Sequence, residues 1–295
     1  MQLLRPDYAE AMTIARRLAD LAERSGNQTH RAAADRALGS TLFYLGDDLD
    51  GSRRHLGQVI ASDALRASRT RFIDELLDVL DPWTACHAYQ AWALWLQGRP
   101  AEARAMSDRA MQLAGELGHP FTRALTLCFD SWLCQFEGDV EATHQRAADA
   151  LALATEQGFG FWIGWAEIME GWAVAAGGSP AEGVAEMRLG LEHWHAVGSE
   201  LGNTYFFTLL AATLADAGDV DGARDALADA AAVGERTGEG WWEPELRRMR
   251  GELELRAGGD RGVAAAHAAA ALALARTRGA EALAARAEET LRRAG

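Results

Sequence analysis

Four ionisable side chains lie in apolar stretches of the chain where acid–base chemistry is possible: Asp130, Glu167, Glu170 and His87. Asp130 belongs to the stretch CFDSWLCQFEG, two residues before a tryptophan. Paired carboxylates on adjacent helices can act as general acid and base, or bind a metal, when burial separates their pKa values. If the chain is an enzyme, these four residues are its expected catalytic groups.

The same acids also have a non-catalytic interpretation. Asp130 lies about 200° around its helix from Trp132, so it faces away from the tryptophan. A solvated polar face, or burial beside arginine partners, would explain such an acid. HExxH, GxSxG and P-loop motifs do not occur, and Cys86, Cys128 and Cys134 form no CxxC pair. We therefore expect no metal site, no cofactor, and three reduced, buried thiols.

Tryptophan recurs at a fixed position along the chain. Trp92, Trp132 and Trp172 each stand six residues before a glycine. Aromatic stripes at helical spacing are typical of a core, but a stripe that lines a groove can grip apolar side chains or stack a flat ligand. With neighbours at a similar helical angle, the expected ligand-binding residues are Trp92, Trp95, Trp132, Phe136, Trp165, Trp172 and Tyr205.

Two interleaved series of glycines reveal an internal repeat that would position these residues. The spacing within each series is 40 residues over most of the chain, and both series share one insertion of 12 residues. The first series is Gly46, Gly98, Gly138, Gly178, Gly218 and Gly258, and the second is Gly26, Gly118, Gly158, Gly198, Gly238 and Gly279.

The residues around these glycines indicate pairs of helices. A glycine just past a helix can take the left-handed conformation that ends it, and a following aspartate can begin the next helix, as at Gly138-Asp139 and Gly46-Asp47. Small residues that would let two helices approach closely stand seven positions before the first glycine series, at Gly39, Ala91, Ser131, Gly171, Ala211 and Gly251.

We expect one all-α domain over residues 1–295, built as a superhelix of helix-turn-helix units. An N-terminal helix occupies 1–26, an insertion occupies 67–78, and a capping helix occupies 280–295. Phe72, Leu76, Leu77 and Leu80 suit a short helix near the insertion, which would widen or cap the groove, or else form a solvated crossover. The expected repeats are 27–66, 79–118, 119–158, 159–198, 199–238 and 239–279.

The repeated unit resembles the tetratricopeptide repeat in a form with about 40 residues per unit. The resemblance is carried by the small residue, the seven-residue step to glycine, and Ala103 and Ala110 of the second helix. The stretches AYQAWALWLQGRPAEA, ELGHPF, ALATEQGFGFW and GEGWWEPELRRMRGELEL are similar to the C-terminal repeat region of bacterial ATPase-linked and adenylate/guanylate cyclase-type regulators. The resemblance covers nearly the whole chain. It implies a right-handed α-solenoid whose first helices face a concave surface, and it implies no reaction.

Composition limits the partners. The formal charge of −14 disfavours nucleic acids and anionic membranes, and all 29 basic residues are arginine, which removes lysine chemistry. The N-terminus MQLLRPDYAE lacks the order of a signal peptide, and no apolar run is long enough to span a bilayer. We expect a cytoplasmic protein.

These observations predict a regulatory binding module that holds a protein segment or small effector in an aromatic concave groove. An enzyme that uses the groove as its active site is one alternative. A scaffold that forms a homo-oligomer through the aromatic stripe is another. Nucleic-acid and membrane partners are not expected.

Overall fold

The computed structural model describes residues 7–62 and 81–295, which form fourteen α-helices and no β-strand. The all-α prediction is confirmed, and the short helix expected around Phe72 to Leu80 lies outside the described residues. The helices are α1 (Tyr8–Ser25), α2 (Gln28–Leu45), α3 (Leu49–Ile60), α6 (Pro82–Leu96), α7 (Pro100–Leu117), α8 (Pro120–Glu137), α9 (Val140–Gln157), α10 (Gly160–Ala176), α11 (Pro180–Ala196), α12 (Asn203–Asp216), α13 (Val220–Thr237), α14 (Glu243–Arg256), α15 (Arg261–Thr277) and α16 (Glu281–Ala294).

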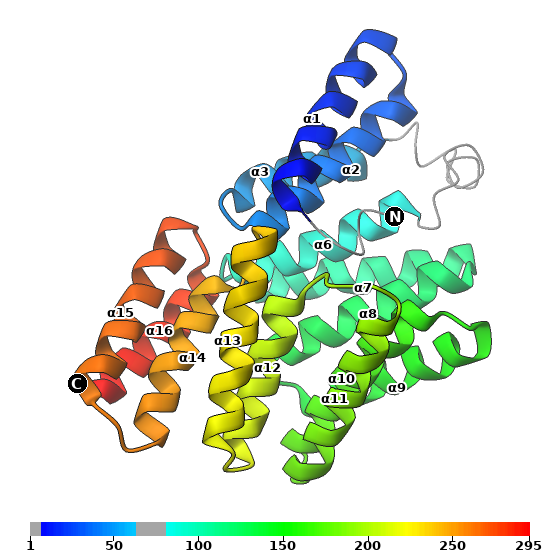
Figure 1. The fold of residues 1–295 in the computed structure, drawn as a ribbon. Coiled ribbons are helices and arrows are strands. Elements are labelled where there is room, and N and C mark those ends of the chain that lie inside the picture. The colour runs from blue at the N-terminus through cyan, green and yellow to red at the C-terminus, as the bar shows by residue number, and fades with distance from the viewer. Residues whose placement is uncertain (1–6, 63–80) are drawn as a thin grey trace.

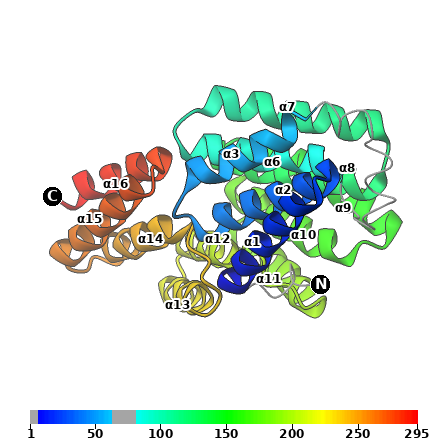
Figure 2. The ribbon, with the colours of Figure 1, turned by 90° about the horizontal axis from the view of Figure 1, so that it is seen from above.

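Consecutive helices pack against each other along the whole array (Figure 1). The helix pairs are α2 with α3, α6 with α7, α8 with α9, α10 with α11, α12 with α13, and α14 with α15; α1 packs on α2 and α16 on α15. Seen from above, α14, α15 and α16 extend to one side of the other helices (Figure 2). None of the described helices is both long and apolar enough to cross a membrane.

Glycine and aspartate mark the helix ends. Gly138 ends α8 with a left-handed φ of 75°, and the Asp139 side chain accepts a 2.9 Å hydrogen bond from a backbone N–H in the first turn of α9. The expected helix start at Asp47 is wrong by one residue, because Asp48 caps α3. Asp47 instead forms an ion pair of 3.4 Å with Arg278.

Small residues allow close contact within the helix pairs. A Cβ atom on Gly171 of α10 would lie 2.6 Å from the backbone nitrogen of Met187 in α11. A Cβ atom on Gly183 would lie 2.3 Å from the Gly171 carbonyl oxygen. Any side chain at either position would therefore force these two helices apart.

Aromatic rings from successive first helices, and from the turn before α14, form the centre of the core. The ring centroid of Trp132 in α8 lies 4.5 Å from Trp92, 4.3 Å from Trp165, 4.3 Å from Tyr205 and 5.6 Å from Trp241. All five side chains are buried. Offset and tilted stacking of this kind adds to the free energy gained from burying the rings.

The two ends of the array meet at this aromatic core. The Tyr44 carbonyl at the end of α2 accepts hydrogen bonds from the backbone N–H groups of Gly240 (2.9 Å) and Trp241 (3.2 Å). Gly46 has a φ of 75°, and a Cβ there would lie 2.5 Å from Trp241 Cα, so only glycine fits. The α2–α3 turn and the start of α14 therefore enclose the core from one side.

Candidate functional site

The aromatic residues expected to bind a ligand lie together, and most of their surface contacts other parts of the chain. Trp92, Trp132, Trp165 and Tyr205 are completely buried, Phe136 and Trp95 are nearly so, and Trp172 is half-buried. The stripe is thus part of the hydrophobic core. Ligand binding by these residues stays a prediction.

Helix α16 covers one edge of the aromatic cluster. The Arg286 guanidinium lies 5.0 Å from the ring centroid of Trp95 and 6.0 Å from that of Trp242, and it donates a hydrogen bond of 3.0 Å to the Phe136 carbonyl. A second hydrogen bond, of 3.2 Å, goes to Glu245. Burial would raise the pKa of Glu245, but two adjacent arginines, Arg286 among them, lower it to about 2.

Asp130 is buried and held by residues of the two flanking second helices. Its carboxylate accepts hydrogen bonds from Arg104 Nη1 of α7 (2.6 Å), Ser107 Oγ of α7 (2.6 Å) and Arg146 Nε of α9 (2.8 Å). Arg104 also pairs with Glu137. Of the alternatives open for Asp130, burial beside arginines is the one observed, and these bonds tie α8 to both neighbours.

The other expected acid–base groups have separate partners. Glu167 lies 2.6 Å from His193 Nδ1, and Glu170 lies 2.7 Å from His144 Nδ1. Burial raises the pKa of Glu170, and His144 partly offsets this effect. His87 Nδ1 contacts a backbone carbonyl one turn earlier in α6, at 2.8 Å. Each of the four groups thus has a contact of its own, and among the described residues no group of His, Cys, Asp or Glu is arranged to hold a metal.

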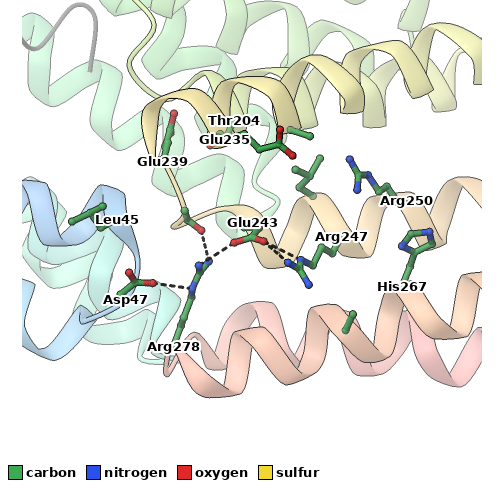
Figure 3. Close-up of a pocket in the computed structure, with 16 residues that line it drawn as sticks. Leu45, Asp47, Thr204, Glu235, Glu239, Glu243, Arg247, Arg250, His267 and Arg278 are labelled. Carbon is green, nitrogen blue, oxygen red and sulfur yellow. Dashed lines mark hydrogen bonds and ion pairs between the residues drawn. The ribbon is translucent and has the colours of Figure 1, made fainter. Parts of the chain in front are cut away.

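A cavity of about 540 Å³ opens between α13, α14, α15 and the α2–α3 turn (Figure 3). Its volume is in the range of small-molecule sites. The charged and polar residues that line it are Asp47, Thr204, Glu235, Glu239, Glu243, Arg247, Arg250, His267 and Arg278.

Ion pairs satisfy the charges at the end of this cavity nearest the α2–α3 turn. Arg278 contacts Asp47 at 3.4 Å and Glu243 at 3.0 Å, and it donates to the Gly240 carbonyl at 2.6 Å. Arg247 contacts Glu243 at 2.5 Å. Figure 3 shows these contacts as a continuous network, which joins the α15–α16 turn to the α2–α3 turn.

Arg250 and His267 differ from these residues. Figure 3 shows Arg250 on α14 and His267 on α15 farther along the same groove. Neither makes a hydrogen bond or ion pair with any residue that the structure describes, and both are half-buried. An arginine side chain stays charged at all ordinary pH values, and a partly buried charge without a partner costs free energy.

A second cavity, of about 260 Å³, adjoins the first, because Arg250 and His267 line both. Its other walls include Arg224 and Leu227 of α13 and Glu254 of α14. We call these two adjoining cavities, which α14 lines, the groove. Arginine side chains in such a groove can bind the oxygens of a carboxylate or phosphate.

Glu239 is a buried acid in the wall of the larger cavity. Its Oε1 accepts a 2.8 Å hydrogen bond from Trp241 Nε1. Burial raises the pKa of Glu239 to about 7, and the bond from Trp241 acts in the opposite direction.

Sequence reasoning missed this groove. The available signal was the alignment of the repeats, in which Asp130, Glu170 and Arg250 each stand eight residues before their glycine. Arg250 alone of the three is basic. The meaning of that change depends on the partners that the flanking helices provide, which only the structure shows.

The chain has been compared with known protein families and with curated proteins. No protein-family model matches the chain. The chain is similar to the uncharacterized protein R02095 of Rhizobium meliloti (strain 1021), with 28% identity over 205 residues. The alignment covers 70% of this chain and 20% of that relative, so the chain spans about a fifth of the relative's length.

Proposed function

We propose that the chain is a tetratricopeptide-like, right-handed α-solenoid that acts as a regulatory binding module, with its ligand in the groove between α13, α14 and α15. The observation that carries this proposal is the cavity of about 540 Å³, in which half-buried Arg250 and His267 have no partner among the described residues. Such a site supplies binding energy and specificity without any arrangement for a reaction.

The groove suits a ligand better than the aromatic stripe does. The stripe is filled by its own rings and covered by α2, α14 and α16, so a ligand would have to displace core contacts. The groove already contains space, charge and hydrogen-bonding groups. The ligand would be a small effector or a short protein segment that reaches into the groove.

Substitutions that fill the groove with a bulky side chain test this proposal. Ala270 of α15 lines the larger cavity, whereas its neighbour Ala269 is exposed. Thermal unfolding of the wild type is measured with a panel of amino acids, short peptides, sugars and nucleotides. A ligand that binds only the native state raises its stability by about 2.7 kcal/mol at a hundredfold excess over Kd.

Stabilising compounds should lose their effect in Ala270→Trp and keep it in the matched control Ala269→Trp. Ala231→Trp, on the opposite wall, provides a second block. If compounds stabilise both blocked variants as well as the wild type, the binding site lies elsewhere and the proposal is wrong. A panel in which no compound stabilises the wild type would also contradict it.

A further inference from the structure

The Asp130 cluster shows how this repeat holds a carboxylate. Two second helices each supply an arginine, Arg104 from α7 and Arg146 from α9, and Ser107 of α7 adds a hydroxyl. All three bonds to the Asp130 oxygens are between 2.6 and 2.8 Å. Charge-assisted hydrogen bonds of this length are among the strongest in proteins.

The last repeat carries the equivalent positions with a different central residue. Asp130 stands eight residues before Gly138, and Arg250 stands eight residues before Gly258. Arg104 and Ser107 precede Asp130 by 26 and 23 residues. By the same steps, Arg224 and Leu227 precede Arg250.

The third partner also has an equivalent. Arg146 stands seven residues after Asp139, which caps α9, and His267 stands seven residues after Asp260, which caps α15. The three positions that contact Asp130 in the earlier repeat therefore correspond to Arg224, Leu227 and His267. All three line the cavity of about 260 Å³, together with Arg250.

The position that supplies a carboxylate in one repeat thus supplies a second arginine in the other. Two arginines and a histidine surround a space, and no carboxylate pairs with Arg250 or His267 among the described residues. Glu254 also lines the cavity but forms no ion pair with Arg250 there. Arg224 uses one nitrogen on the exposed Asp221, at 3.0 Å.

Other first-helix residues that stand eight positions before their glycine have partners from second helices. Gln90 exchanges hydrogen bonds with Arg53 of α3, and Glu170 pairs with His144 of α9. Leu210 needs no polar partner. Arg250 is the exception at this position, because it is charged and half-buried and has no hydrogen-bond or ion-pair partner among the described residues.

We propose that a carboxylate of a bound ligand occupies this space, between Arg224, Arg250 and His267, as the Asp130 carboxylate does between Arg104 and Arg146. This inference rests on the proposed function and names the chemical class of its ligand. The rest of the ligand lies in the adjoining larger cavity, which shares Arg250 and His267. Glu254 in this cavity and Glu235 in the adjoining one favour one carboxylate over a doubly charged phosphate.

Substitution of Arg250 tests the assignment. Arg250→Asp places a carboxylate beside Arg224 and His267, as Asp130 lies beside Arg104 and Arg146, so it should fold, should be at least as stable as the wild type in urea, and should no longer bind carboxylates. Arg250→Gln removes an unpaired charge and should weaken carboxylate binding by about tenfold to a hundredfold. Arg276→Gln is the control, because Arg276 is exposed on α15 and pairs with Glu288 outside the groove.

Binding is measured by calorimetry and thermal shift with succinate, L-glutamate, trialanine, trialanine amide and inorganic phosphate, each against chloride at equal ionic strength. Binding of succinate or L-glutamate that depends on Arg250 supports a small carboxylate ligand. Binding of trialanine but not of its amide, with the same dependence, supports a peptide C-terminus as the source of the carboxylate.

Three results would overturn the inference: no carboxylate binds, phosphate binds and carboxylates do not, or Arg250→Asp binds carboxylates as the wild type does. These results leave the proposed function intact if another class of compound still depends on the open groove in the Ala270→Trp comparison. Conversely, Arg250→Asp could stabilise the protein while no compound loses its effect in Ala270→Trp. That result would contradict the proposed function but not the equivalence of the two clusters.

Discussion

Replacement of Trp132 by alanine should remove the centre of the hydrophobic core. The side chain is completely buried and contacts rings from α6, α10 and α12. A tryptophan side chain buries roughly 150–250 Å². At about 25 cal/mol per Å², its transfer from water contributes roughly 4–6 kcal/mol, and tryptophan-to-alanine changes in cores cost about 3–5 kcal/mol.

The indole nitrogen of Trp132 has no hydrogen-bond partner in the described residues, so the loss comes from packing alone. We expect Trp132→Ala to lower the free energy of unfolding by about 4 kcal/mol, a large part of the roughly 5–15 kcal/mol typical of a native protein. Urea denaturation followed by circular dichroism measures it.

Trp172→Ala is the matched control, because Trp172 belongs to the same stripe but is only half-buried. It should lose roughly 1–2 kcal/mol. If Trp132→Ala loses no more unfolding free energy than Trp172→Ala, the aromatic cluster is not a tightly packed core. The stripe would then again be a candidate for the ligand-binding groove.

Three further changes test single contacts. Asp130→Asn removes the carboxylate that Arg104 and Arg146 share, and among the described residues only Arg104 keeps another partner, Glu137, so it should cost about 1.5–3 kcal/mol in urea denaturation. A cost below about 1 kcal/mol would mean that the cluster is solvated. Because the pKa of Glu239 is raised to about 7, the wild type should lose stability as pH rises from 4.5 through 7, and Glu239→Gln should not. Above pH 7 that variant should be more stable by up to about 3 kcal/mol, and parallel pH profiles of the two proteins would contradict the assignment. Gly46→Ala should destabilise by at least about 2 kcal/mol, because φ is 75° and the new Cβ would meet Trp241; thermal unfolding near that of the wild type would show that the turn can relax.

Local signals in the sequence were sufficient for the helical architecture. Glycine at helix ends, aspartate at helix starts and small residues between paired helices each act over a few residues, so they can be read without knowing the rest of the fold. Asp139 and Gly138 follow this rule. Asp47 departs from it, because two aspartates follow Gly46 and the second one caps α3 while Arg278, distant in sequence, pairs with the first.

The surroundings of the aromatic stripe could not be predicted in the same way. The periodicity places Trp92, Trp132 and Trp165 on one side of their helices, but it contains no information on what covers that side. Coverage comes from contacts between residues far apart in the chain, such as Tyr44 with Trp241 and Arg286 with Phe136. A helical array in which distant helices meet buries a face that an open array would expose.

The same reasoning explains why one repeat can carry the proposed binding site. The second helices of the array present polar side chains toward one position of the first helix, and the residue at that position decides whether those side chains are satisfied. Asp130 satisfies two arginines, and Glu170 satisfies a histidine. Arg250 cannot satisfy Arg224 or His267, because it has the same sign of charge as the first and no acceptor for the second. Arg250 in place of Asp130, together with Leu227 and His267 in place of Ser107 and Arg146, therefore replaces a closed internal ion pair by the proposed open site, beside the adjoining cavity that leaves room for the rest of a ligand.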